Sequence, residues 1–491
     1  MKGTIWYVAM RWGIRLLGFV SSAVLARLLM PEDFGLVAIV LVVSGLVSLL
    51  FEFGVNMALI QNNKAEDSHF NTAWTIRLFQ SCAVAALLVL VAPFIADYYE
   101  DSRVAVITYF IAAGTALRGL QNIGIIKFQK DMNFGRDFMF NVLTKLLSIL
   151  VTIGLAFYYR SYMALVLGTV WAGLVSVALS YVFISYRPCL TLEKWREIWG
   201  FSQWVLIRNI AQYFSQEGDK FILASLVGPV KMGFYKWGTE LSFMTISEVQ
   251  QPFSRALVPG LAKIKDNHPR LIAAYLQALN AMTFIAVPVA LGFGAVAEEF
   301  IPLFLGGGDK WMPVVPLVEG LVFFAMLTAM YGISGSMLTI SGNVKYTAYM
   351  FWIQAIVTLS SIYPAYQYFG LEGVAYSRAL IGVVMFFVVS MMVVMTCQVR
   401  WSRILDVVWR PVIAGVTMYF VLISMTAAFT IPSWQLLFLK ILAGIILYPL
   451  MALSLWWLSG MPATFEKRLT QQIKLRLTFG KTKTDYQDKA N

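Results

Sequence analysis

The sequence predicts an all-α polytopic membrane protein with about fourteen transmembrane helices, and three observations lead to this class. Of the 491 residues, 59% are hydrophobic and only 13% are charged, whereas soluble chains carry roughly 25% charged residues. Apolar runs of about 20 residues recur along the whole chain, and helices of that length cross a bilayer core of roughly 30 Å. The alternating segments of about 10 residues that are typical of a membrane β-barrel do not appear.

The spans follow one another with short loops between them, and each is taken from an apolar run bounded by charged, Pro or Gly residues. The N-terminal run lacks a cleavage site after a short apolar core, so we expect a retained first span and no signal peptide. The expected spans are 5–29, 35–60, 73–96, 104–127, 138–159, 162–186, 200–226, 234–258, 272–296, 313–340, 345–369, 371–396, 409–430 and 435–458.

Basic residues orient the chain in the membrane. Lys and Arg crowd the loops on the side of both termini, while the opposite loops hold only Arg103, Arg160, Lys231 and Lys310. Because cytoplasmic loops carry the excess of basic residues, both termini are expected in the cytoplasm. The net charge of +12 then needs no nucleic acid to explain it.

A short motif occurs twice. Leu25-Ala-x-Leu-x-x-Pro-x-x-x-Gly35 returns as Leu223 to Gly233, and "NMALIQ" from Asn56 aligns with "SRALVP" from Ser254 at the same offset. Both copies of the first motif leave a span that runs outward. The two halves are therefore expected to be parallel repeats, a plan used by transporters that rock one half against the other.

The repeat suggests a division into domains. We expect an N-lobe of six spans over 1–190, a C-lobe of six spans over 191–400 and two added spans over 401–460. The tail over 461–491 places apolar residues on one helical stripe and basic residues elsewhere, which is typical of an amphipathic helix on the cytoplasmic membrane surface.

Charged residues inside the expected spans are the candidate binding site. Such residues cost roughly 2.5 to 3.5 kcal/mol near the bilayer centre, so they usually face the bundle interior or line a pathway. In the N-lobe spans these residues are basic apart from one acid. In the C-lobe spans basic and acidic residues are nearly equal in number. The candidates for a cationic, inward-opening cavity are Arg11, Arg15, Glu52, Arg118, Lys145 and Arg208.

Arginine favours an anionic cargo at this site, because its planar guanidinium makes paired hydrogen bonds to phosphate or carboxylate. Glu52 is expected to pair with an arginine. The alternative for all these residues is that they tie helices together or extend to the membrane surface. Glu217 and Asp219 could hold a coupling ion, although an internal charge cluster explains them equally well.

Signals for catalysis, metals or cofactors are weak. The three cysteines are far apart and form no C-x-x-C pair, so neither a disulfide framework nor a zinc site is indicated. The stretch "FLGGGDKW" at 304–311 lacks the spacing and the Ser or Thr of a phosphate-binding loop. We expect it to be an outer turn. No enzyme activity, metal or cofactor is predicted.

The chain resembles the Wzx-type polysaccharide repeat-unit flippases of the MOP exporter superfamily. The resemblance lies in "VLARLLMPEDFGLVA", "FEFGVNMALIQ", "KFQKDMNFGRDF", "LASLVGPVKMGFY" and "FIPLFLGGGDKWMPVVPLVEGL", which are spread over most of the chain. The glycine-rich insertion before Trp311 departs from the shorter turn expected in the family.

The resemblance implies a function. It implies two six-helix lobes around a central cavity, and a cargo of undecaprenyl-pyrophosphate-linked oligosaccharide that moves from the inner to the outer leaflet by alternating access. Membrane lipid surrounds the carrier tail, and a polysaccharide polymerase or chain-length machinery is a candidate partner. A monomer is expected, since two lobes already form a pathway.

Three other functions stay open at this point. A peptidoglycan lipid-precursor flippase would share the basic N-lobe. A multidrug or cation antiporter of the same superfamily would need acids for cationic drugs, and the N-lobe spans offer only Glu52. A non-transport scaffold for a polysaccharide synthase would leave membrane-embedded arginines unexplained. The sugar unit and the coupling ion do not follow from the sequence.

Overall fold

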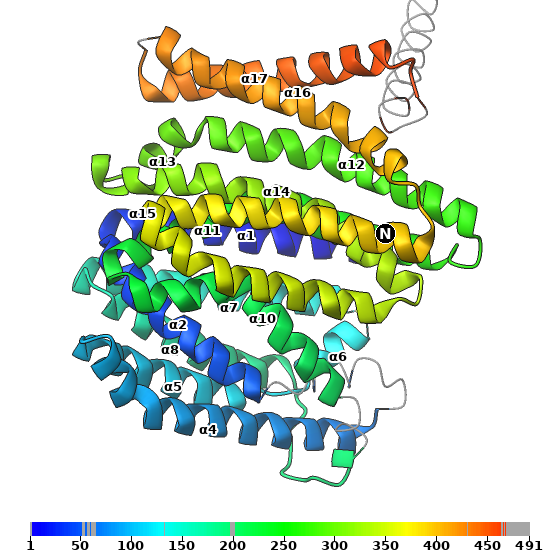
Figure 1. Cartoon of the computed structure of the whole chain (residues 1–491). Coiled ribbons are helices and arrows are strands. Elements are labelled where there is room, and N and C mark those ends of the chain that lie inside the picture. The colour runs from blue at the N-terminus through cyan, green and yellow to red at the C-terminus, as the bar shows by residue number, and fades with distance from the viewer. Residues whose placement is uncertain are drawn as a thin grey trace, which may run out of the picture. The chain divides into compact units, whose positions relative to one another are not determined.

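The computed structural model describes residues 2–51, 55, 59, 65–131, 133–196, 202–429, 431–462, 465 and 467. In this part of the chain every regular element is a helix (Figure 1). Contacts divide the chain into two compact units, and each is described by itself. Unit 1 comprises 1–237, 304–312 and 355–364, and unit 2 comprises 238–303, 313–354 and 365–491.

Unit 1 contains the helices of the first part of the chain. Of these, α4 lies along α5, α7 along α8, α1 along α7, and α10 along α2. The apolar core of the unit gathers around Leu36, Leu88 and Ile107. Its helices are α1 (Lys2–Leu28), α2 (Pro31–Leu50), α4 (Asp67–Tyr98), α5 (Ser102–Gly119), α6 (Ile125–Lys130), α7 (Phe134–Tyr159), α8 (Met163–Phe183) and α10 (Ser202–Leu226).

Unit 2 is built around α12 (His268–Ala295), which packs against α14 (Val315–Ile340), α16 (Trp401–Ala428) and α17 (Ser433–Leu458). The buried Lys440 of α17 donates to Glu299 Oε1 at 2.5 Å and to Ala295 O at 3.0 Å. Glu299 belongs to α13 (Ala297–Leu305). This pair fastens α17 to the end of α12, and both of its members are almost wholly buried.

Four elements contribute residues to both units. They are α11 (Pro229–Ala262), α13, the 3₁₀ helix η1 (Gly308–Val314) and α15 (Val344–Cys397). The backbone of α15 leaves helical geometry at Gly370, with φ 64° and ψ −153°, a conformation open mainly to glycine. The two spans expected at 345–369 and 371–396 are therefore the two parts of α15.

The all-helical, multi-span class is confirmed. Nine stretches of the described residues are long and apolar enough to cross a membrane. Four further described helices have the length but more polar compositions, namely α1, α5, α10 and α11. Three of these four carry every candidate cavity residue except Glu52 and Lys145, as expected if polar helices line a pathway.

One expected span was too long. The run 104–127 ends as a helix at Gly119, and α6 begins separately at Ile125. Asn122 causes the break, because its side-chain oxygen accepts from Gly124 N at 2.9 Å and its amide group donates to Tyr186 O at 2.6 Å. Such local side-chain bonds compete with helix continuation. The division into N-lobe, C-lobe, added spans and tail stays a prediction.

Candidate functional site

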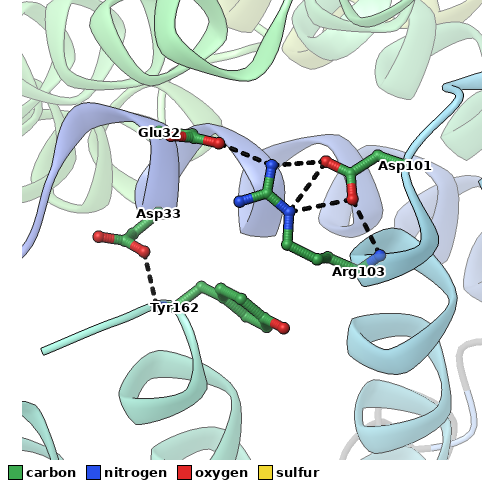
Figure 2. A network of polar contacts seen from close by, with 5 residues as sticks. All are labelled: Glu32, Asp33, Asp101, Arg103 and Tyr162. Atoms are coloured by element: carbon green, nitrogen blue, oxygen red, sulfur yellow. Dashed lines mark hydrogen bonds and ion pairs between the residues drawn. The ribbon is translucent and has the colours of Figure 1, made fainter. Parts of the chain in front are cut away.

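The turn between α1 and α2 is fixed by a polar network (Figure 2). Asp33 accepts from Met30 N at 2.8 Å and from Tyr162 N at 2.7 Å. Glu32 pairs with Arg103 at 2.6 Å, and Arg103 also pairs with Asp101 at 2.7 Å. The start of α2 is thereby tied to the adjoining ends of α5 and α8.

Asp101 is the N-cap of α5, where its side chain accepts from Arg103 N. The Arg103 guanidinium, by hydrogen bonding to the carboxylate, holds the pKa of Asp101 below its usual range. The Arg103 contact therefore favours the ionised form of Asp101.

The same turn lies against its own sequence repeat. A β-carbon added at Gly35 would lie 1.7 Å from Pro229 O, and one added at Gly233 would lie 1.9 Å from Pro31 O. Each glycine thus lies against the proline that begins the other copy's helix. This reciprocity is the mark of a local two-fold relation, so the repeated motif forms a contact between the beginnings of α2 and α11.

Aromatic rings cover this contact. Phe34 lies 5.2 Å from Trp237 and 5.9 Å from Trp311, centroid to centroid. The Lys236 ammonium lies over Phe34 and Trp237, 4.7 and 4.4 Å from the ring centroids. Trp237 and Trp311 are fully buried. We call the contact of Gly35 and Gly233, together with the rings of Phe34, Trp237 and Trp311, the glycine junction.

The structure locates the candidate cavity residues on separate helices. Arg15 is half-buried on α1, and Arg118 and Lys145 are exposed on α5 and α7. Arg11 and Arg208 lie on α1 and α10, but their side chains fall outside the description, and Glu52 lies wholly outside it. The convergence of these residues on one cavity stays a prediction.

Arg118 lies in the last turn of α5 and is close to a glycine. Its Cγ would lie 3.7 Å from a β-carbon at Gly173 of α8. Its carbonyl oxygen accepts from Arg77 at 3.4 Å, and Arg77 also donates to Gln121 Oε1 at 2.5 Å. Arg77 therefore satisfies a carbonyl at the end of a helix, whereas the side chain of Arg118 is exposed.

Lys145 belongs to a stripe of polar residues on α7 that was not predicted from the sequence. Asn141 donates to Asp137 Oδ1 at 2.9 Å, and Ser148 and Thr152 each donate to the carbonyl four residues earlier. Asp137 is 4% exposed. The spacing of four residues between these polar groups was the available signal.

The two acids proposed for a coupling ion have partners in the folded chain. Asp219 is buried and accepts from Tyr235 Oη at 2.5 Å and from Lys220 N at 2.9 Å. Glu217 pairs with Lys220 at 2.8 Å. Asp219 therefore joins α10 to α11 in this state, and a coupling ion would have to replace such contacts.

The described residues hold no cluster of three or more His, Cys, Asp or Glu side chains suited to a metal ion.

The chain matches known proteins in sequence. Residues 24–316, more than half of the chain, match the family model described as "Polysaccharide biosynthesis protein". The lipopolysaccharide biosynthesis protein WzxC of Escherichia coli is 25% identical over 67% of this chain and 67% of its own. A putative O-antigen transporter of Shigella flexneri is 22% identical over 77% of this chain and 94% of its own.

Solved structures show the same fold. The lipid II flippase MurJ in an inward closed conformation superposes with a TM-score of 0.74 at 13% identity, covering 92% of this chain and 99% of that one. An inward-facing MATE multidrug transporter of the MOP superfamily superposes with a TM-score of 0.61 at 15% identity. The match covers 78% of this chain and 96% of that one. At these identities the likeness concerns the fold alone. By its sequence match over residues 24–316, the chain belongs to the family of polysaccharide biosynthesis proteins.

Proposed function

We propose that this polysaccharide-biosynthesis transporter turns undecaprenyl-pyrophosphate-linked oligosaccharide repeat units from the inner to the outer leaflet of the bacterial cytoplasmic membrane by alternating access. All fourteen expected spans cross the membrane in this proposal. The two lobes are parallel repeats, and the last two spans are an addition. Both termini lie in the cytoplasm, in accord with the distribution of Lys and Arg.

The observation that carries the proposal is the reciprocal contact of Gly35 and Gly233. A transporter that alternates must be able to close one side of its pathway by bringing equivalent parts of its repeats together. The positive-inside distribution places the starts of α2 and α11 on the outer side. In this orientation the glycine junction closes the outer side, and it would have to open before cargo could leave on that side.

The cargo follows from charge and from the relatives. Arg15 lies 13 residues from the start of α1, about 20 Å along the helix at 1.5 Å per residue, so a pyrophosphate entering from the cytoplasm could reach it. Guanidinium groups recognise pyrophosphate oxygens by paired hydrogen bonds. The relatives are named for lipopolysaccharide biosynthesis, O-antigen transport and succinoglycan biosynthesis transport, which supports an oligosaccharide on that anchor.

Replacing Arg15 with Ala tests the proposal in cells whose own copy of the gene is deleted. We expect loss of surface polysaccharide, accumulation of lipid-linked repeat units on the inner leaflet and an unchanged amount of protein in the membrane. Arg11→Ala is expected to behave alike. A matched control is Arg160→Ala, which removes an outer-loop charge.

Normal surface polysaccharide in both cavity variants would overturn the arginine assignment. If cell-wall synthesis stopped and surface polysaccharide were made normally, the cargo would instead be the peptidoglycan precursor. Efflux of cationic drugs by the wild-type protein, with polysaccharide unaffected by its deletion, would favour a multidrug antiporter.

A further inference from the structure

A nine-residue segment from the second half of the chain packs within unit 1. Residues 304–312, called the latch segment, belong to unit 1, although the residues on both sides of them belong to unit 2. Phe304 stacks on Phe19 of α1 with ring centroids 4.1 Å apart. The segment includes the glycine-rich stretch that was expected from the sequence to be an outer turn.

Lys310 and Trp311 bind the end of α1. The Lys310 ammonium donates to Ala26 O at 3.1 Å and also to Leu29 O, and Trp311 Nε1 donates to Ala26 O at 3.2 Å. The last carbonyls of a helix lack partners within the helix and carry partial negative charge. A lysine from a distant part of the chain therefore caps α1.

Three consecutive glycines give the segment its path. Gly306, Gly307 and Gly308 have φ of 72°, 77° and 60°, values that other residues rarely adopt. A β-carbon at Gly306 would also lie 2.7 Å from Arg27 Cγ. The insertion that looked unusual in the sequence is what brings Lys310 back onto α1.

Trp311 connects this cap to the glycine junction. Its ring lies 5.9 Å from both Phe34 and Trp237, and it is fully buried. Opening the outer side would separate the start of α2 from the start of α11, and the ring packed between them would lose its contacts.

We propose that residues 304–312 form a latch that holds the outer side closed. This rests on the proposed function, which places the glycine junction on the outer side. Each closed-state contact of Lys310 and Trp311 must break for release, so removing them shifts the population toward the outward-open state.

Thiol labelling measures that shift in whole cells. Ala26 is fully buried, so Ala26→Cys reports opening of the outer side to a membrane-impermeant maleimide. The native cysteines are replaced first, as Cys82→Ser, Cys189→Ser and Cys397→Ala. Ser102→Cys, at an exposed position at the start of α5, is the control for access from outside.

We expect Lys310→Met to raise the labelling rate of Ala26→Cys on the order of tenfold, as for the loss of charged hydrogen bonds, and to leave Ser102→Cys unchanged. Lys310→Arg should preserve slow labelling, because it keeps the cation. Trp311→Phe should raise the rate less, since it removes one hydrogen bond and keeps an aromatic ring.

The latch would be overturned if Lys310→Met and Trp311→Phe left the labelling rate of Ala26→Cys unchanged while Ser102→Cys was labelled normally. That result would leave the transport proposal intact. A Ser102→Cys that reacts only in permeabilised cells would overturn the orientation, and with it both proposals.

Discussion

Gly35 of α2 and Gly233 of α11 lie against each other's helix starts so closely that neither has room for a β-carbon. We expect Gly35→Ala to destabilise this closed contact and to abolish transport, because inserted carbon atoms in a tightly packed site typically cost about 1 to 3 kcal/mol. Surface polysaccharide and the labelling rate of Ala26→Cys are the measurements. Gly228→Ala in the neighbouring turn, where a β-carbon meets nothing within 4 Å, should behave as wild type; equal effects of both variants would contradict the junction.

Substitution of Arg118 should impair transport, whereas substitution of Arg77 should lower stability. Arg118 has an exposed side chain, so Arg118→Ala is expected to abolish transport with little change in thermal stability. Arg77 bonds the end of α5, so Arg77→Ala should lower the unfolding temperature of the purified protein. Surface polysaccharide and thermal unfolding in detergent check the pair. Loss of stability in Arg118→Ala would assign Arg118 a structural role.

The buried pair of Lys440 and Glu299 predicts a stability effect in unit 2. Lys440→Met leaves a buried carboxylate without its cation, which typically costs about 3 to 5 kcal/mol. The double variant Lys440→Met, Glu299→Gln should recover most of that loss, because no buried charge remains. Thermal unfolding of the three proteins in detergent measures this, and a double variant no more stable than the single would count against a charge effect.

The Asp101 and Arg103 pair predicts a response to pH. Since the pKa of Asp101 is held below its usual range, its contribution to stability is present above the unfolded pKa of about 3.9 and is lost as pH falls through the lower folded value. We expect this contribution to stay constant from about pH 7 to pH 5 and to fall below about pH 4. Comparing unfolding temperatures of wild type and Asp101→Asn over this range isolates it; a difference that disappears already near pH 6 would refute the assignment.

Much of the helical plan was predictable, because apolar runs and Pro or Gly breaks have local causes. The break inside α15 at Gly370 was expected from the sequence, whereas α2 begins at Pro31, four residues before the expected start of that span at 35. The end of α5 was misplaced, since Asn122 ends it through bonds to Gly124 and to the distant Tyr186.

The site was less predictable because its contacts join distant parts of the chain. The sequence showed that the motif of Gly35 recurs at Gly233, but only the fold shows that the copies touch. It offered no sign that Lys310 caps α1, because the partner is a backbone carbonyl and not a charged side chain. The gathering of Arg11, Arg15, Glu52, Arg118, Lys145 and Arg208 around one cargo stays a prediction.

Transport by the purified protein tests the central claim most directly. The protein is reconstituted into liposomes holding an undecaprenyl-pyrophosphate-linked oligosaccharide, and an added glycosidase reports how much sugar becomes accessible on the other leaflet. We predict that sugar crosses with wild-type protein, does not cross with Arg15→Ala, and that a cationic drug fails to compete. Equal crossing with wild-type protein, Arg15→Ala and empty liposomes would contradict the account.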